Sequence, residues 1–179
     1  DASAPAEALT RALELTWAAL RTPVSLPGLS LPRGLADVAR RAAEVPFLHP
    51  IPERSHVPLG AADEGGWSVE RGYVRGVIDL LLEHEGRTFV VDWKTDRLDG
   101  WSEESVRAHV RAGYEVQLRL YALAAARMPG LGGRAAWEAR FGGLVYVFLR
   151  GLEVAPEASL FFARPSHDEL RRWDEEMRA

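Results

Sequence analysis

Apolar and polar positions follow two different periods along this chain. Stretches with an apolar residue every three or four positions predict amphipathic helices, and short continuous runs of Val, Leu, Ile and Phe predict buried strands. Helices are expected at residues 5–21, 35–43, 102–128 and 167–178, the third with a break near Gly113. Strands are expected at residues 45–48, 69–75, 77–82, 89–93, 144–149 and 159–163. Because strands and helices follow one another in this way, the pattern predicts an α/β fold.

Proline and glycine mark the connections between these segments. Residues 22–34 hold three prolines and two glycines, and residues 49–68 are rich in Pro, Gly and acidic side chains, so both are expected to be loops. Pro46 cannot donate to a ladder, which places its strand at a sheet edge. The strand–helix–strand order over residues 88–149 implies a right-handed parallel crossover. These features predict one domain over residues 1–179, with a mixed central sheet flanked by helices.

Two acids interrupt the apolar runs 77–82 and 89–93. A two-residue turn at Glu85-Gly86 would form a hairpin in which Asp79 and Asp92 lie directly opposite each other. Like charges in that position destabilise a sheet, and carboxylates in an apolar hairpin resist burial. A divalent cation would compensate both effects, and hard cations such as Mg²⁺ prefer oxygen ligands. The hairpin therefore predicts a metal site.

A single lysine stands beside this pair of acids. The 22 basic residues comprise 21 arginines and Lys94, which follows Asp92 at i+2 and would share its face of the strand. Lysine is a compact charge that can contact a nucleophilic water, whereas arginine is a rigid fork that stays protonated. The alternative is a structural ion pair of Lys94 with Asp79 or Asp92. The opposed acids, their apolar setting and the unique lysine together favour the metal site.

Composition narrows the possible functions. The chain is 47% hydrophobic and 27% charged, which is typical of a globular domain, and no apolar run reaches the length of a membrane span. It has no cysteine, so thiolate chemistry is excluded and a cytoplasmic location is expected. It has no phosphate-binding P-loop, so it is not itself an ATP motor. Its net charge of −4 argues against autonomous DNA binding and favours a module to which other domains deliver DNA.

The acid on one strand and the D-x-K on the next resemble the PD-(D/E)xK nuclease superfamily, and within it the C-terminal nuclease domains of the RecB type. Most of residues 40–179 takes part in this resemblance. The matching blocks are AEVPFLHPI with its acid Glu44, GVIDLLLEHEGRTFVVDWKTD, YEVQLRLYALA with Gln117 and Tyr121 as the family's Q-x-x-x-Y, FGGLVYVFLRGLE, and ARP at 163–165.

The chain departs from the family pattern in two places. Ile78 stands where the superfamily has a proline before the first acid. The family also carries a G-T-x-x-H-like segment on an upstream helix, whose histidine helps to hold the metal, and no such segment occurs in this sequence. We therefore expect the chain to lack the N-terminal part of the domain and to be one metal ligand short.

The resemblance implies a restriction-endonuclease-like fold and a Mg²⁺-dependent deoxyribonuclease, with Mn²⁺ as a substitute. It assigns the metal to Asp79, Asp92 and the Trp93 carbonyl, activation of water to Lys94 together with the metal, and orientation of the acids, the water or the DNA to Gln117 and Tyr121. The implied activity is of the exodeoxyribonuclease V type, within a RecBCD-like helicase–nuclease that acts in double-strand break repair by homologous recombination. The implied partners are DNA, RecC- and RecD-like subunits, the RecB helicase region and RecA, with no membrane.

Two alternatives stay open at this point. The chain could be a catalytically silent, nuclease-like docking module of a recombination complex, which the acidic net charge and the missing ligand favour. It could also be another member of the superfamily, such as a restriction-type nuclease. The intact set of Asp79, Asp92 and Lys94 favours an active enzyme, and the FGGLVYVFLRG block favours the RecB type.

Overall fold

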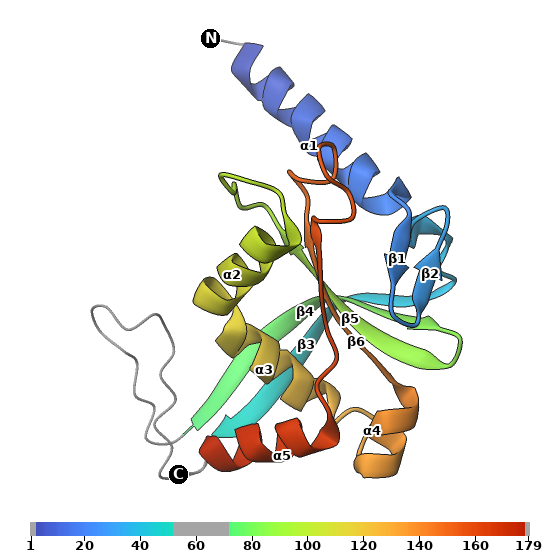
Figure 1. Ribbon diagram of the computed structural model, residues 1–179, viewed down its shortest axis with the longest axis vertical. Helices are drawn as coiled ribbons and strands as arrows, with labels where there is room; N and C mark the ends of the chain where they lie inside the picture. The colour runs from blue at the N-terminus through green and yellow to red at the C-terminus, as the bar shows by residue number, and fades with distance from the viewer. Residues whose placement is uncertain (1–2, 52–71, 178–179) are drawn as a thin grey trace, which may run out of the picture.

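A five-stranded mixed sheet forms the centre of the computed structural model, which describes residues 3–51 and 72–177 (Figure 1). The strands are β1 (Val24–Leu26), β2 (Leu29–Leu31), β3 (Arg40–Ile51), β4 (Gly72–His84), β5 (Arg87–Lys94), β6 (Phe141–Phe148) and β7 (Leu160–Ala163). The helices are α1 (Ser3–Arg21), the 3-10 turn η1 (Leu35–Asp37), α2 (Glu103–Gly113), α3 (Glu115–Ala125), α4 (Arg134–Arg140) and α5 (His167–Glu176).

The central sheet has the strand order β3-β4-β5-β6-β7. Neighbouring strands are antiparallel except β5 and β6, which run parallel. A parallel pair needs a long crossover, and the segment that contains α2, α3 and α4 provides it. The predicted α/β fold, the mixed sheet, the edge position of the strand with Pro46 and the parallel crossover are therefore confirmed.

Each face of the sheet is covered by a different set of elements. One face, here called the helical face, carries Val90, Leu144 and Tyr146 and packs against α2, α3, α4 and α5. The opposite face, here called the hairpin face, packs against the β1-β2 hairpin and the last turns of α1. The rest of α1 projects beyond the sheet, as Figure 1 shows. No helix in the described part of the chain is long and apolar enough to cross a membrane.

The β4-β5 hairpin has the predicted turn and register. Glu85 and Gly86 both have positive φ, at 49° and 75°, which is the signature of the type I′ turn that two-residue hairpins prefer. The strand pairs run from His84–Arg87 to Leu80–Val91. The ladder therefore ends one step before Asp79 and Asp92, in the register that would place the two acids opposite each other.

The side-chain alternation of β4 breaks at Asp79. In a regular strand, residues two positions apart share a face. Leu80 packs on the hairpin face, yet Ile78 packs on the helical face. The neighbouring strand β3 is irregular at the same level, because Glu44 has a φ of 54° and lies between the paired residues Ala43 and Val45. Two adjacent irregularities thus surround the first acid of the site.

Several sequence expectations need correction. Residues 22–34 are not a loop, because the alternating buried residues of V-S-L and L-S-L form the hairpin β1-β2 despite the prolines around them. The helix expected at 35–43 is only the turn η1, since pairing with β4 draws the chain into a strand from Arg40 onward. The loop expected at 49–68 begins with strand residues up to Ile51, and its remainder lies outside the described residues.

The sequence predicts some of the helices correctly and misses others. The break near Gly113 is confirmed as the junction of α2 and α3, and the terminal helix is confirmed as α5. The short helix α4 was not predicted. In α1 the apolar side chains of Leu9, Leu13 and Trp17 are exposed, whereas Leu15 and Ala19 are buried.

The turn at Gly86 is testable by its backbone strain. Gly86→Ala forces an L-residue into φ +75° with open space around the new methyl group, so we expect a loss of about 1 kcal/mol in the free energy of unfolding. Urea denaturation measures it. The matched control is Gly100→Ala, which also has open space but no positive φ, and which should change stability by less than about 0.5 kcal/mol. Equal losses in both variants would contradict the turn assignment.

Candidate active site

Asp92 and Lys94 form a buried ion pair at the C-terminal end of β5. Both side chains are on the helical face, and their residues are only 3% and 7% exposed. Lys94 Nζ lies 2.6 Å from Asp92 Oδ2. The i+2 spacing on a strand explains the pairing, since it brings the two side chains to the same side.

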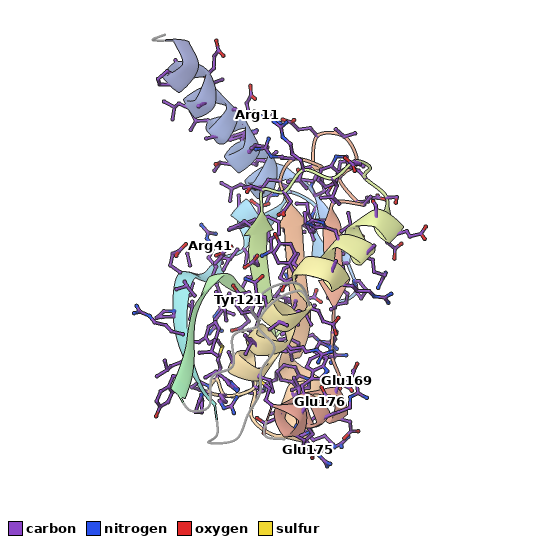
Figure 2. All side chains as sticks on the ribbon, turned by 90° about the vertical axis from the view of Figure 1, so that its left-hand side faces the viewer. Arg11, Arg41, Tyr121, Glu169, Glu175 and Glu176 are labelled. Carbon is purple, nitrogen blue, oxygen red and sulfur yellow. The ribbon has the colours of Figure 1, made fainter. Side chains whose placement is uncertain are left out.

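Helix α3 connects the two members of this ion pair through hydrogen bonds, which gives a closed chain of contacts. Lys94 Nζ donates to Gln117 Oε1 at 2.7 Å, and Gln117 Nε2 donates to the Tyr121 hydroxyl at 3.0 Å. The Tyr121 hydroxyl lies 2.9 Å from both Asp92 Oδ1 and the Val77 carbonyl, and its one proton can go to either. Figure 2 labels Tyr121 near the middle of the molecule, where α3 crosses the sheet. The i, i+4 spacing of Gln117 and Tyr121 is what lets one helix reach both charges.

Asp79 joins the site from β4. Its Oδ2 accepts a hydrogen bond from the Trp93 amide at 2.9 Å, in the gap where the β4-β5 ladder has ended. Trp93 turns its indole to the hairpin face, where it is partly buried, and its backbone is held by Asp79. The structure therefore brings together Asp79, Asp92, Trp93, Lys94, Gln117 and Tyr121, all the residues assigned to the site from the sequence.

The surroundings of Asp92 change the pKa of its carboxyl. Burial raises the pKa of its carboxyl, and the nearby charge of Asp79 raises it further. The ammonium of Lys94 and the Tyr121 hydroxyl act in the opposite direction, but the net pKa stays above the ordinary value of 3.8. The negative charge at Asp92 is thus only partly compensated by the groups around it.

The donor set suits a hard divalent cation. Asp92 Oδ2 is buried and accepts no well-aligned hydrogen bond, although Lys94 is close. Carboxylate oxygens of this kind are the ligands that Mg²⁺ and Mn²⁺ prefer. Among the described residues, no three His, Asp or Glu side chains converge on one point. A cation at Asp79 and Asp92 would therefore take its remaining ligands from backbone carbonyls or water.

Two aromatic rings enclose Lys94, and sequence reasoning did not single them out for the site. Lys94 Nζ lies 3.8 Å from the centroid of the Tyr114 ring and 4.9 Å from that of Tyr146. Tyr146 pairs with Asp92 across β5 and β6, so the parallel register could have indicated it. Tyr114 lies at the break between α2 and α3, a position that no strand or helix period identifies.

Glu44, the acid of the β3 block, lies at the level of Asp79 in the strand register but is exposed. Across residues 3–51 and 72–177, no hydrogen bond or ion pair joins its carboxylate to Asp92 or Lys94. The structure thus leaves Glu44 at the margin of the site.

A groove adjoins the site on the side of α3. It has a volume of about 430 Å³ and is lined by Gln117, Tyr121 and Arg75, together with apolar residues of β3, β4 and α3. Because β4 pairs with β5 only from Leu80 onward, the edge of its first half has no partner strand on this side in the described part of the chain. The groove is thus bounded by an open strand edge and leads to the hydrogen-bonded chain of the site.

Comparisons with known proteins give a family model and several relatives to which the chain is similar. The family model of the PD-(D/E)XK nuclease superfamily matches residues 1–179. The alignment with the RecBCD enzyme subunit RecB of Escherichia coli strain K12 is 183 residues long and 30% identical. It covers 90% of this chain and 15% of RecB.

Other species give similar matches. The RecB protein of Mycobacterium tuberculosis is 34% identical over 138 residues, which cover 71% of this chain and 12% of that protein. An ATP-dependent helicase/nuclease of Carboxydothermus hydrogenoformans is 44% identical over 61 residues, or 34% of this chain and 5% of that protein. The chain therefore spans only a small part of each of these relatives, 15% of the first and less of the others.

The raised pKa of Asp92 predicts that Asp92→Asn becomes more stable relative to wild type as the pH rises. Because the native carboxyl holds its proton more tightly than the unfolded one, the wild type loses stability as the pH rises from about 3.8 through the native pKa. Asparagine stays neutral and escapes this loss. In chelator-containing buffer, we expect the unfolding free energy of Asp92→Asn relative to wild type to increase with pH over that window.

The control for this experiment is an acid with the opposite shift. Asp168 is exposed, and its hydrogen bond with Arg134 lowers the pKa of its carboxyl. Asp168→Asn should therefore slightly reduce stability at neutral pH and not at low pH. A difference between Asp92→Asn and wild type that stays flat or shrinks with pH would contradict the electrostatic description of the site.

Proposed function

This chain belongs to the PD-(D/E)XK nuclease superfamily, and from that premise we propose that it is the metal-dependent DNA phosphodiesterase domain of a RecBCD-type helicase–nuclease. The observation that carries the proposal is the closed chain from Asp92 through Lys94 and Gln117 to Tyr121, with Asp79 beside it. A purely structural ion pair would not need a second carboxylate next to it, because like charges in a sheet are destabilising.

The metal ligands in this proposal are Asp79, Asp92 and the Trp93 carbonyl. Mg²⁺ is the proposed ion, with Mn²⁺ as a substitute, since all three groups offer oxygen. A bound divalent ion would lower the pKa of a water molecule and stabilise negative charge on a phosphoryl oxygen. Asp79 also accepts a hydrogen bond from the Trp93 amide. The same carboxylate would therefore bind the ion and hold the backbone of the residue whose carbonyl is the third ligand.

Lys94 is the proposed group that orients the attacking water and stabilises charge developing at phosphorus. Its ammonium is already held by Asp92 and Gln117, so little reorganisation is needed at the moment of reaction. Tyr121 fixes the Asp92 carboxylate by its hydrogen bond. Burial and the charge of Asp92 raise the pKa of Tyr121, so its hydroxyl remains a neutral donor.

The substrate would approach through the groove beside α3. Arg75 can contact a phosphate there, and the open edge of β4 offers backbone groups to a nucleic-acid strand. The net charge of −4 supports delivery of the DNA by other parts of an assembly. We accordingly place the chain with a RecB helicase region, RecC- and RecD-like subunits and RecA, in cytoplasmic double-strand break repair by homologous recombination.

Cleavage by lysine variants tests the proposal. In the helicase–nuclease assembly, Lys94→Ala should lower Mg²⁺-dependent cleavage of end-labelled linear DNA by at least about 100-fold, because an organised donor to the reacting group is lost. Asp92→Ala should behave alike. The control Arg33→Ala removes an exposed cation that pairs with nearby Asp37, and should cut at the wild-type rate. Cleavage that survives in Lys94→Ala would refute the assignment.

Metal-dependent stability separates the enzyme from a silent docking module. With Mg²⁺ at about 100 times its dissociation constant, a bound ion stabilises the wild type by about 2.7 kcal/mol. We expect this gain to disappear in Asp79→Asn, which keeps an acceptor for the Trp93 amide but removes the charge. Asp37→Asn, an acid outside the site that pairs with Arg33, should keep the gain. A wild type that shows no gain over matched NaCl would favour the docking module.

A further inference from the structure

We propose that Tyr114, held by Asp96, is a positioning residue that keeps the Lys94 ammonium directed into the reaction site. The catalytic part of this inference rests on the proposed function, whereas the physical part, a tyrosine ring that fixes a lysine, does not. The D-x-K and Q-x-x-x-Y patterns include neither residue, although both lie in the longer matching blocks at residues 76–96 and 114–124. The support comes from the contacts that surround Lys94 and from the position of Tyr114 in the chain.

Lys94 has three N–H donors and a different neighbour in each direction. Asp92 Oδ2 lies at 2.6 Å and Gln117 Oε1 at 2.7 Å. The face of the Tyr114 ring covers the ammonium at 3.8 Å, closer than the ring of Tyr146 at 4.9 Å. An aromatic face attracts a buried cation without neutralising its charge, unlike a second carboxylate. Tyr114 therefore restrains the ammonium and leaves its positive charge available.

The Tyr114 ring is itself fixed at its far end. Its hydroxyl lies 2.8 and 2.9 Å from the two carboxylate oxygens of Asp96. His109 Nε2 lies 3.2 Å from Asp96 Oδ1, and the His109 ring packs edge-on against Tyr114 with centroids 5.7 Å apart. On its other side, Tyr114 makes an edge contact with Tyr146 at 5.8 Å. The ring thus has little freedom to move away from Lys94.

The pKa shifts are consistent with a permanent hydroxyl–carboxylate bond. Burial and the hydrogen bond to Asp96 raise the pKa of Tyr114 to about 12, so the hydroxyl keeps its proton at neutral pH. Burial opposes ionisation of Asp96, but hydrogen bonds from Tyr114 and His109 outweigh it and lower the pKa of the carboxyl. At neutral pH the hydroxyl of Tyr114 is therefore protonated and the carboxyl of Asp96 is ionised, as this hydrogen bond requires.

The chain path explains why this one tyrosine can act on the site. Asp96 lies two residues after Lys94, just beyond the end of β5. Tyr114 can therefore contact both residues: its hydroxyl bonds Asp96 and its ring covers Lys94. Tyr114 has φ −127° and ψ 4°, outside the helical region, and it ends α2 and precedes α3. The same break sets the start of the helix that carries Gln117. Two neighbours of Lys94, the Tyr114 ring and Gln117, are thus positioned by the backbone at and just after this break.

The unique lysine makes the physical part directly measurable. Lys94 is the only lysine in the sequence, so the 179-residue chain grown with ¹³C-lysine gives a single ε-methylene signal by NMR. A ring stacked on the ammonium should shift that signal upfield. We expect most of the shift to persist in Tyr114→Phe, which keeps the ring but loses its bond to Asp96, and to fall clearly in Tyr114→Leu, where only the more distant ring of Tyr146 remains. Tyr73→Leu, which removes an exposed ring on β4, should leave it unchanged.

Kinetics test the catalytic part in the helicase–nuclease assembly. Tyr114→Leu should lower kcat by about ten- to a hundredfold with little change in KM, because the ammonium is misplaced while the DNA-binding groove is intact. Tyr114→Phe should retain most of the kcat. If Tyr114 were purely structural, the loss of kcat in each variant would instead follow its own loss in melting temperature.

The possible outcomes distinguish this inference from the proposed function. An unshifted lysine signal in the wild type, or a shift of the same size in Tyr114→Leu and wild type, overturns the positioning role whatever the activity. A ring-dependent shift together with an assembly that cuts no DNA supports the contact and overturns the nuclease proposal and the catalytic part of the inference. A ring-dependent shift with a normal kcat in Tyr114→Leu overturns the catalytic part alone.

Discussion

The charge of Asp92, buried beside a second carboxylate, is the constraint on which the rest of this structure depends. Ionising a group that is 3% exposed costs free energy unless its neighbours compensate, and the carboxylate of Asp79 increases that cost. Two groups provide this compensation, the ammonium of Lys94 on the same strand and the phenol of Tyr121 on a crossing helix. The compensation is incomplete, since the pKa of Asp92 remains raised. The site therefore still favours added positive charge, which the proposed divalent cation would supply.

The same region gives up regular sheet structure. The β4-β5 ladder stops at Leu80–Val91, the alternation of β4 breaks at Asp79, and Glu44 on β3 takes a positive φ. Each of these features forgoes regular backbone pairing or adopts a less favourable backbone conformation. Together they turn the Asp79 carboxylate sideways onto the Trp93 amide and leave an open strand edge along the groove. A continuous ladder would occupy the Trp93 amide and cover the open strand edge, so both features depend on the local irregularity.

Much of this site could be predicted from the sequence, because short-range rules determine it. The Glu85-Gly86 turn fixes the register of the two acids, the i+2 spacing pairs Asp92 with Lys94, and the i, i+4 spacing joins Gln117 to Tyr121. The β1-β2 hairpin was missed because its alternating apolar residues are embedded among prolines. The bulge at Asp79 and the ring of Tyr114 depend on how β3 and α3 approach β4 and β5, and no local period records such an approach.

The geometry also gives a physical reason for the one lysine in an arginine-rich chain. The space at the end of β5 is bounded by Asp92, Gln117 and the rings of Tyr114 and Tyr146, all close to a single nitrogen. A compact ammonium meets these neighbours in different directions, whereas a planar guanidinium is larger and presents its donors as a fork in one plane. An arginine here would have to displace a ring or leave donors unpaired in a buried site, which is costly. The shape of these surroundings therefore favours lysine over arginine, a restriction that does not apply to the solvent-exposed cations elsewhere.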